Sequence, residues 1–383
     1  MSAALHVGKL APAISALQQA LGTSLLQAGF LLSLVQLAGM SLGLALGAAG
    51  DRLGPRRSML VGLCLLAVAS GLGGAATGVT ALMVLRAVEG FGFLLVVLPA
   101  PGLLRALVPA QRLSAVLGLW SAYMPLGTAL ALLLGPLCIQ LLGWRAWWWL
   151  LGGLSLVVAW TLARAVPALA AARPVAGGWL ASLGRTLAAP GPWLVAVIFA
   201  AYSSQWLAVI GFLPTIYTQA GVPGAAMAVL TAGAAAANIA GNVVAGRALQ
   251  RGVPARSLLL LGFASMAATA TLAFAALGLP PALRYAAVLL FSGVGGLIPG
   301  TLFSLAVRVA PGERTLATTV GWVQQWSSMG QFVGPPAVAW VASQAGGWHW
   351  TWIVTGAASV LGGVLSMVLA RRLVLQPIGF ETS

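Results

Sequence analysis

Long apolar runs recur along the whole chain and are separated by short clusters of Gly, Pro and Arg. Because about 20 residues of helix cross the hydrocarbon core of a bilayer, each run predicts one transmembrane helix. The predicted spans cover residues 25–49, 58–77, 80–104, 113–138 and 145–166, and then 193–218, 225–248, 257–278, 282–307, 316–343 and 350–370.

The stretch before the first of these runs is shorter and more polar than a full span. Its apolar positions from Leu10 to Leu21 lead into a turn at Gly22, Thr23 and Ser24, which predicts a short first helix. The total is then twelve helices. In an alternative interpretation, translation begins upstream and the chain lacks the first turns of that helix.

Composition supports the membrane interpretation. Of the 383 residues 60% are hydrophobic and only 6% are charged, whereas about a quarter of residues are charged in soluble proteins. A net charge of +15 would suggest nucleic acid in a soluble protein, but here the Arg residues are spread in small groups over short connectors. We therefore expect an all-α membrane protein whose surroundings are the lipid bilayer, and no nucleic-acid partner.

The positive charges predict an orientation. Fifteen of the 19 Lys and Arg residues fall on alternate connectors and the tail, at Arg52, Arg56, Arg57, Arg105, Arg112, Arg164, Arg173, Arg185, Arg247, Arg251, Arg256, Arg308, Arg314, Arg371 and Arg372. The opposite connectors keep only Arg145 and Arg284. Since cytoplasmic loops carry the excess of Lys and Arg, we expect an inner-membrane protein with both termini in the cytoplasm.

The two halves of the chain match residue by residue. Gly47, Asp51, Arg52, Arg57 and Ser58 each correspond to a residue 199 positions later, the last pair being Ser58 and Ser257. Corresponding segments lie on the same side of the membrane, so each repeat holds six spans and the repeats are parallel. We expect an N-terminal bundle at 1–166, a cytoplasmic central linker at 167–192, and a C-terminal bundle with a short tail at 193–383.

The segment that runs from Gly47 through Gly50-Asp51-Arg52 to Gly54-Pro55-Arg56-Arg57 resembles the signature between helices two and three of the major facilitator superfamily. Its degenerate copy after helix eight strengthens the resemblance, and Arg86, Gly90 and Gly92 are similar to the family's second motif. Helix five departs from the family's antiporter motif at Ala122 and Ala131. The resemblance implies a secondary transporter that works by alternating access. It also implies a conformational latch at Gly47, Asp51, Arg52, Gly54 and Arg57.

Few ionisable residues fall within the predicted spans: Lys9, Arg86 and Glu89, with His6 near the start. Such residues are costly in lipid and are typical of functional sites. Arg86 and Glu89 are three apart and therefore share one helical face. One hypothesis is a structural ion pair. The other is that Arg86 or Lys9 receives an anionic substrate group while Glu89 exchanges protons.

Polar and aromatic residues at mid-span depth are candidates for the wall of a substrate cavity. They are Gln36, Trp120, Tyr123, Tyr202, Gln205, Asn238, Asn242, Trp322, Gln324, Gln325 and Trp326. Two Trp clusters at span ends, 147–149 and 348–352, are interpreted as an aromatic belt at the membrane surface. Cys64 and Cys138 lie in apolar runs and are expected to be buried thiols.

Nothing in the chain resembles an enzyme: it has no phosphate-binding loop of the Gly-rich Lys-Ser/Thr type and no hydrolytic triad. No cofactor or metal is expected. The sequence favours a monomeric, proton-coupled transporter of a small solute, with an organic anion suggested by charge alone. Alternatives are an exporter of drugs or other hydrophobic compounds and, from another class, a polytopic membrane enzyme or receptor. Substrate identity, import or export, and symport or antiport stay open.

Overall fold

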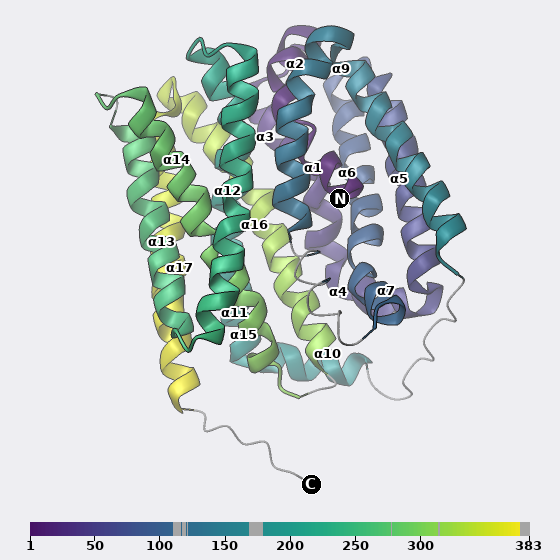
Figure 1. The fold of residues 1–383 in the computed structure, drawn as a ribbon, viewed down its shortest axis with the longest axis vertical. Helices are drawn as coiled ribbons and strands as arrows, with labels where there is room; N and C mark the ends of the chain where they lie inside the picture. Colours follow the sequence, from purple (N-terminus) through teal and green to yellow (C-terminus); the bar gives the residue numbers. More distant parts are fainter. Residues whose placement is uncertain are drawn as a thin grey trace.

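A computed structural model describes residues 1–109, 116, 120, 122–167, 179–276, 278–312 and 315–375. For residues 46–53, 105, 317 and 373–375 it describes the backbone alone. The described chain forms twelve transmembrane helices in two groups of six, which stand side by side with their long axes roughly parallel (Figure 1). The predicted all-α class and the twelve-helix arrangement are confirmed.

The helices of the first group are interrupted more often than the apolar runs suggested. In chain order they are α1 (Ser2–Gly8) with η1 (Ala11–Ala13) and α2 (Ile14–Leu21); α3 (Leu25–Ser33) with η2 (Leu34–Gln36) and α4 (Leu37–Leu53); α5 (Pro55–Gly74); α6 (Val79–Val97) with α7 (Ala100–Leu107); and α9 (Tyr123–Ala165). Gly143 divides α9 into the fifth and sixth helices, because its φ of 83° lies in the left-handed region that glycine adopts without strain.

The second group also contains six transmembrane helices, and some of them are interrupted as well. It comprises α11 (Pro190–Gln219), α12 (Gly224–Gln250), α13 (Ala255–Ala270) with η3 (Thr271–Ala275), α14 (Pro281–Gly295) with α15 (Leu297–Val309), α16 (Leu316–Ala345), and η5 (Trp348–Trp350) with α17 (Thr351–Leu375). The short helix α10 (Trp179–Ala188) precedes it and lies across one end of the molecule, at the bottom of Figure 1. The start of α5, the turn from α12 to α13, and the ends of α15 and α17 lie at the same end of the molecule as α10 (Figure 1). These segments carry Arg56, Arg57, Arg185, Arg247, Arg251, Arg256, Arg308, Arg371 and Arg372, and we name this end the arginine-rich end.

Nine helices among the described residues are long and apolar enough to cross a membrane. The kinked α9 counts once among them although it crosses twice. The first helix falls short because it is interrupted at Pro12. Helix α16 is long enough, but Gln324, Gln325 and Gln331 make it more polar than its neighbours.

The two groups meet mainly where α3 and α4 pack against α16 and where α9 packs against α12, and η1 also contacts α11. Glycines make the first contact close. A Cβ atom on Gly39 would lie 2.4 Å from Oγ of Ser328, and one on Gly29 would lie 3.0 Å from the backbone of Pro335 and Pro336. Small residues therefore let the backbones of the two groups approach directly, as is common where helices pack in lipid.

The outer surface of both groups is apolar, as expected for a protein surrounded by lipid. Val61, Val68 and Leu72 of α5, for example, are each more than half exposed. The expectation of a buried thiol at Cys64 is wrong, because Cys64 shares this exposed face of α5, and Cys138 is half-buried. Apolar runs cannot distinguish the lipid-facing side of such a helix from the protein-facing side, since both are apolar.

Candidate functional site

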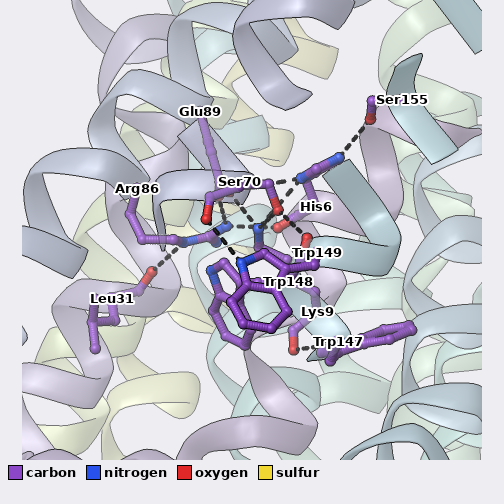
Figure 2. Close-up of polar contacts among 11 residues, drawn as sticks. His6, Lys9, Leu31, Ser70, Arg86, Glu89, Trp147, Trp148, Trp149 and Ser155 are labelled. Carbon is purple, nitrogen blue, oxygen red and sulfur yellow. Dashed lines mark hydrogen bonds and ion pairs between the residues drawn. The ribbon is translucent and has the colours of Figure 1, made fainter. Parts of the chain in front are cut away.

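The described ionisable residues within the spans gather at one place inside the N-terminal group (Figure 2). His6 and Lys9 come from the first helix, and Arg86 and Glu89 come from α6. Ser70 of α5 completes the set, which we name the ion cluster. Residues up to 83 positions apart in the chain therefore form a single polar centre between the first helix, α5 and α6.

Arg86 is held at three places. Its Nη1 donates to Oε2 of Glu89 at 2.6 Å and to the carbonyl oxygen of His6 at 2.7 Å, and its Nε donates to the carbonyl oxygen of Leu31 at 3.2 Å. Both carbonyls lie next to helix interruptions, His6 beside the break that precedes η1 and Leu31 beside η2. The interruptions free these oxygens from the regular helical ladder and so make them available to the guanidinium.

Lys9 contacts four partners. Its Nζ forms an ion pair with Oε1 of Glu89, donates to Oγ of Ser70 at 2.8 Å, and lies 3.4 Å from Nδ1 of His6. The ammonium also stands over the ring of Trp148, 4.7 Å from its centroid. Ser70 in turn donates to the carbonyl oxygen of Trp148 at 2.7 Å, which fixes its hydroxyl as an acceptor toward Lys9.

His6 bridges the cluster to the sixth helix. Its Nε2 lies 2.8 Å from Oγ of Ser155, and its Nδ1 faces Lys9. An ammonium can only donate, so the Nδ1 that faces it acts as an acceptor and the hydrogen belongs on Nε2. The hydrogen-bond partners thus assign a neutral imidazole to His6.

The cluster is sealed from its surroundings. His6, Lys9, Ser70 and Arg86 are 0% exposed and Glu89 is 1% exposed. With a neutral His6 and a charged Lys9, two cations surround one carboxylate, so the cluster carries one positive charge in excess. Among the described residues, Nη2 of Arg86 has no hydrogen-bond partner. A buried excess charge of this kind is expensive unless something offsets it.

The structure corrects the assignment of Trp147 and Trp148 to an aromatic belt. Trp148 is 0% exposed and covers Lys9, and Trp147 is 3% exposed and donates from Nε1 to the carbonyl oxygen of Lys9 at 3.1 Å. Trp149 is 51% exposed and does face outward. Ser70, Ser155 and Trp148 were not identified as site residues from sequence, because an isolated Ser or Trp in an apolar run looks like ordinary packing.

Two of the other candidate residues lie where the halves meet. Nε2 of Gln36 donates to Oε1 of Gln331 at 2.9 Å, and Oε1 of Gln325 accepts from the backbone N–H of Leu44 at 3.0 Å. Gln331 was missed in the sequence analysis, although it lies on the same helix as Gln325. We name the contact of α3 and α4 with α16 the central seam.

Trp322 lies on α16 near the start of that helix. Its ring packs against Trp193 of α11 and Trp326, with centroids 4.7 and 5.9 Å away. Its Nε1 is buried and has no hydrogen-bond partner among the described residues. An unpaired indole N–H of this kind is available to a polar solute atom.

Three candidate residues lie inside the C-terminal group. Nδ2 of Asn238 donates to the hydroxyl of Tyr202 at 2.8 Å and to the carbonyl oxygen of Ser292 at 2.9 Å. Oε1 of Gln205 accepts from Ser359 at 2.9 Å. All these contacts join helices of the same group, so we name them the neutral network.

The remaining candidates lie elsewhere. Tyr123 stacks on Trp120 at 5.2 Å between centroids, at the start of α9. Of the latch residues, Gly54 has a φ of 73° and forms the one-residue turn between α4 and α5, and Arg57 is exposed beside it. For the other three, Gly47, Asp51 and Arg52, the structure describes the backbone alone.

Comparison with known proteins gives the family. Residues 1–324 match the Major Facilitator Superfamily. Among solved structures, the chain is similar to a bacterial homolog of the human lysosomal transporter Spinster in an inward-facing and occupied conformation, with a TM-score of 0.83 and 14% identity over 97% of this chain and 94% of that one. The unoccupied form of the bacterial homolog matches with a TM-score of 0.75 and 14% identity over 99% and 97%. No curated protein matches the sequence. The family match, the parallel six-helix groups and the signature turn at Gly54 together show that the chain belongs to the major facilitator superfamily of transporters.

Proposed function

We propose that this protein is a proton-coupled secondary transporter that carries a small organic anion across the inner membrane by alternating access. The observation that carries the proposal is the ion cluster, in which Lys9 and Arg86 share the single carboxylate of Glu89 within the membrane. Ionisable groups at this depth are typical of ion and proton pathways. The excess positive charge favours an anionic solute over a cationic one.

The central seam supports alternating access. Transport of this kind requires that two bundles rock against each other around a midplane site. Gln36, Gln325 and Gln331 lie at the boundary that must open, and Trp322 offers an unpaired N–H on the same helix. We propose that these residues and Tyr123 contact the solute, and that Tyr202, Gln205 and Asn238 fix the helices that present it.

The arginine-rich end supports the orientation. We propose that it faces the cytoplasm together with both termini, and that residues 1–166 and 193–383 move as two bundles joined by a linker at 167–192. Single Cys probes at Pro55 and Gly221 test this arrangement. Pro55 begins α5 at the arginine-rich end, whereas Gly221 follows the last residue of α11 at the opposite end of the molecule. Labelling of both positions from the same side of intact cells would contradict the orientation.

The decisive experiment is counterflow in proteoliposomes that contain the purified, full-length protein. Vesicles preloaded with unlabelled solute are given labelled mono- and dicarboxylates, neutral sugars or hydrophobic cations in parallel. We expect exchange of a carboxylate, and accumulation of that carboxylate when an inward proton gradient is imposed. Exchange of hydrophobic cations alone would instead support a drug exporter, and exchange of none of the three would contradict solute transport.

A further inference from the structure

Lys9 is unlike every other cation in this chain. Arginine supplies 18 of the 19 basic residues, at the connectors, at the tail and within α6, and Lys9 is the only lysine. A guanidinium stays charged under all physiological conditions, whereas an amine can release its proton. Among the Lys and Arg residues, the one cation that can change its charge therefore lies in the buried ion cluster, at 0% exposure.

Charge counting favours Lys9 over Glu89 as the group that changes protonation. If Glu89 took up a proton, Lys9 and Arg86 would be left as two buried cations without a carboxylate. If Lys9 releases its proton instead, the ion pair of Arg86 with Glu89 stays intact and the cluster becomes neutral. The second change removes a buried charge, whereas the first adds one.

The surroundings of Lys9 suit both protonation states. A neutral amine keeps two hydrogens, which donate to Oε1 of Glu89 and to Oγ of Ser70. Its lone pair then faces Nδ1 of His6, so in this state the imidazole hydrogen belongs on Nδ1 and the hydroxyl of Ser155 donates to Nε2. The charged or titratable side chains that face Lys9 among the described residues are His6, Arg86 and Glu89, and the sixth helix contributes the ring of Trp148 and, through His6, Ser155. Arg86 is fixed by the carbonyl oxygens of His6 and Leu31, so its position does not depend on Lys9.

We propose that Lys9 is the proton carrier of this transporter, and that its proton and one negative charge of the solute bind together. This inference rests on the proposed function and specifies its coupling step. In the empty state Lys9 is neutral, and the pair of Arg86 with Glu89 carries no net charge. In the loaded state the Nζ–H bond of Lys9 forms with a proton taken from water, and a solute carboxylate offsets the new charge.

The step is balanced. One proton and one monovalent anion enter the site together, and on the other side of the membrane the Nζ–H bond breaks, its electron pair stays on nitrogen, and the proton returns to water. The free Nη2 of Arg86 is the donor placed to meet the anion. Both the loaded and the empty cluster are then neutral, which lowers the cost of moving either one through the membrane.

The single lysine makes the test direct. Full-length protein grown on lysine labelled with ¹³C at Cε and placed in lipid nanodiscs shows one lysine resonance, whose shift reports the charge on Nζ without any need for a substrate. As a reference, Arg372→Lys adds one lysine at an exposed position, and Lys9→Arg removes the signal under study. We expect the Lys9 resonance to move at a pH well below that of the reference resonance, which should move near the ordinary lysine value of about 10.4.

Transport by Lys9→Arg gives the second readout. This variant keeps a cation beside Glu89 but cannot release a proton, so accumulation of the carboxylate under a proton gradient should fall far more than its counterflow in the same vesicles. A Lys9 resonance that titrates only with the reference would overturn the proposal, and so would undiminished accumulation by Lys9→Arg. Failure of the proposed function is a separate result, because wild-type vesicles would then exchange no carboxylate whatever the resonance shows.

Discussion

The two halves of this transporter share an architecture and differ in the polar groups at their centres. The N-terminal half holds the ion cluster, in which Lys9 and Arg86 pair with Glu89, whereas the C-terminal half holds the neutral network of Tyr202, Asn238 and Gln205. Both sets are buried and both join neighbouring helices. Only the first can change its charge when a proton or a solute arrives.

The difference indicates that the two halves have different roles in transport. Hydrogen bonds between neutral side chains in a membrane are worth about 0.6 kcal/mol on average, enough to fix helix positions and little more. Breaking a buried ion pair costs about 3–5 kcal/mol, because one charge is left without a partner. We infer that the C-terminal half acts as the fixed scaffold, and that the N-terminal half carries the element whose energy depends on proton and solute.

The largest expected effect is that of Glu89→Gln. The variant leaves Arg86, and also Lys9 whenever it is protonated, without a carboxylate, so we expect thermal stability in detergent to fall by an amount equivalent to about 3–5 kcal/mol, with little folded protein recovered. Lys9→Met is the matched control, since it keeps the pair of Arg86 with Glu89. If Lys9→Met were the less stable of the two variants, the charge count in the cluster would be wrong.

The next effect concerns the seam between the halves. Gly39→Ala places a methyl group within 2.4 Å of Ser328 Oγ, so the halves cannot close to their present distance. We expect the counterflow rate to drop severely while the protein stays folded. Gly71→Ala is the control, because a Cβ atom there meets nothing within 4 Å among the described residues. Equal rates for the two variants would show that the close approach at Gly39 is not needed.

A smaller effect is expected from Asp51→Asn at the latch. The C-terminal copy of the motif has Gln250 at the matching position, so a neutral side chain is tolerated in one half of the same fold. We expect slower counterflow with solute affinity changed by no more than a few-fold, since Asp51 lies in the last turn of α4, whereas the ion cluster is formed by the first helix, α5 and α6. Loss of solute binding by the folded variant, measured as protection from thermal unfolding, would place Asp51 in the binding site instead.

The smallest effect is expected from Tyr202→Phe in the neutral network. The change removes one hydrogen bond, and Asn238 keeps its second bond to the carbonyl oxygen of Ser292. The expected loss of stability is about 0.6 kcal/mol, and counterflow should be unchanged. A large loss of transport without a loss of stability would show that Tyr202 contacts the solute. It would contradict the inference that the C-terminal half acts only as the fixed scaffold.

The sequence by itself determined the class, the helix count, the family resemblance and the face shared by Arg86 and Glu89. These follow from local rules: apolar length counts spans, and a spacing of three places two side chains on one helical face. It also identified Lys9 as an ionisable residue within a span, because charges in apolar segments are rare enough to stand out.

Only the tertiary structure decided which partners those residues meet. The pairing of Lys9 with Glu89 spans 80 positions, and Trp148 covers the ammonium instead of facing the membrane surface. The placement of Tyr202 and Asn238 within one half, and of Gln36 against Gln331 between the halves, depends on how each helix is rotated. In lipid both sides of a helix can be apolar, so the rotation is set by close packing and polar partners from other helices, which the pattern along one segment does not record.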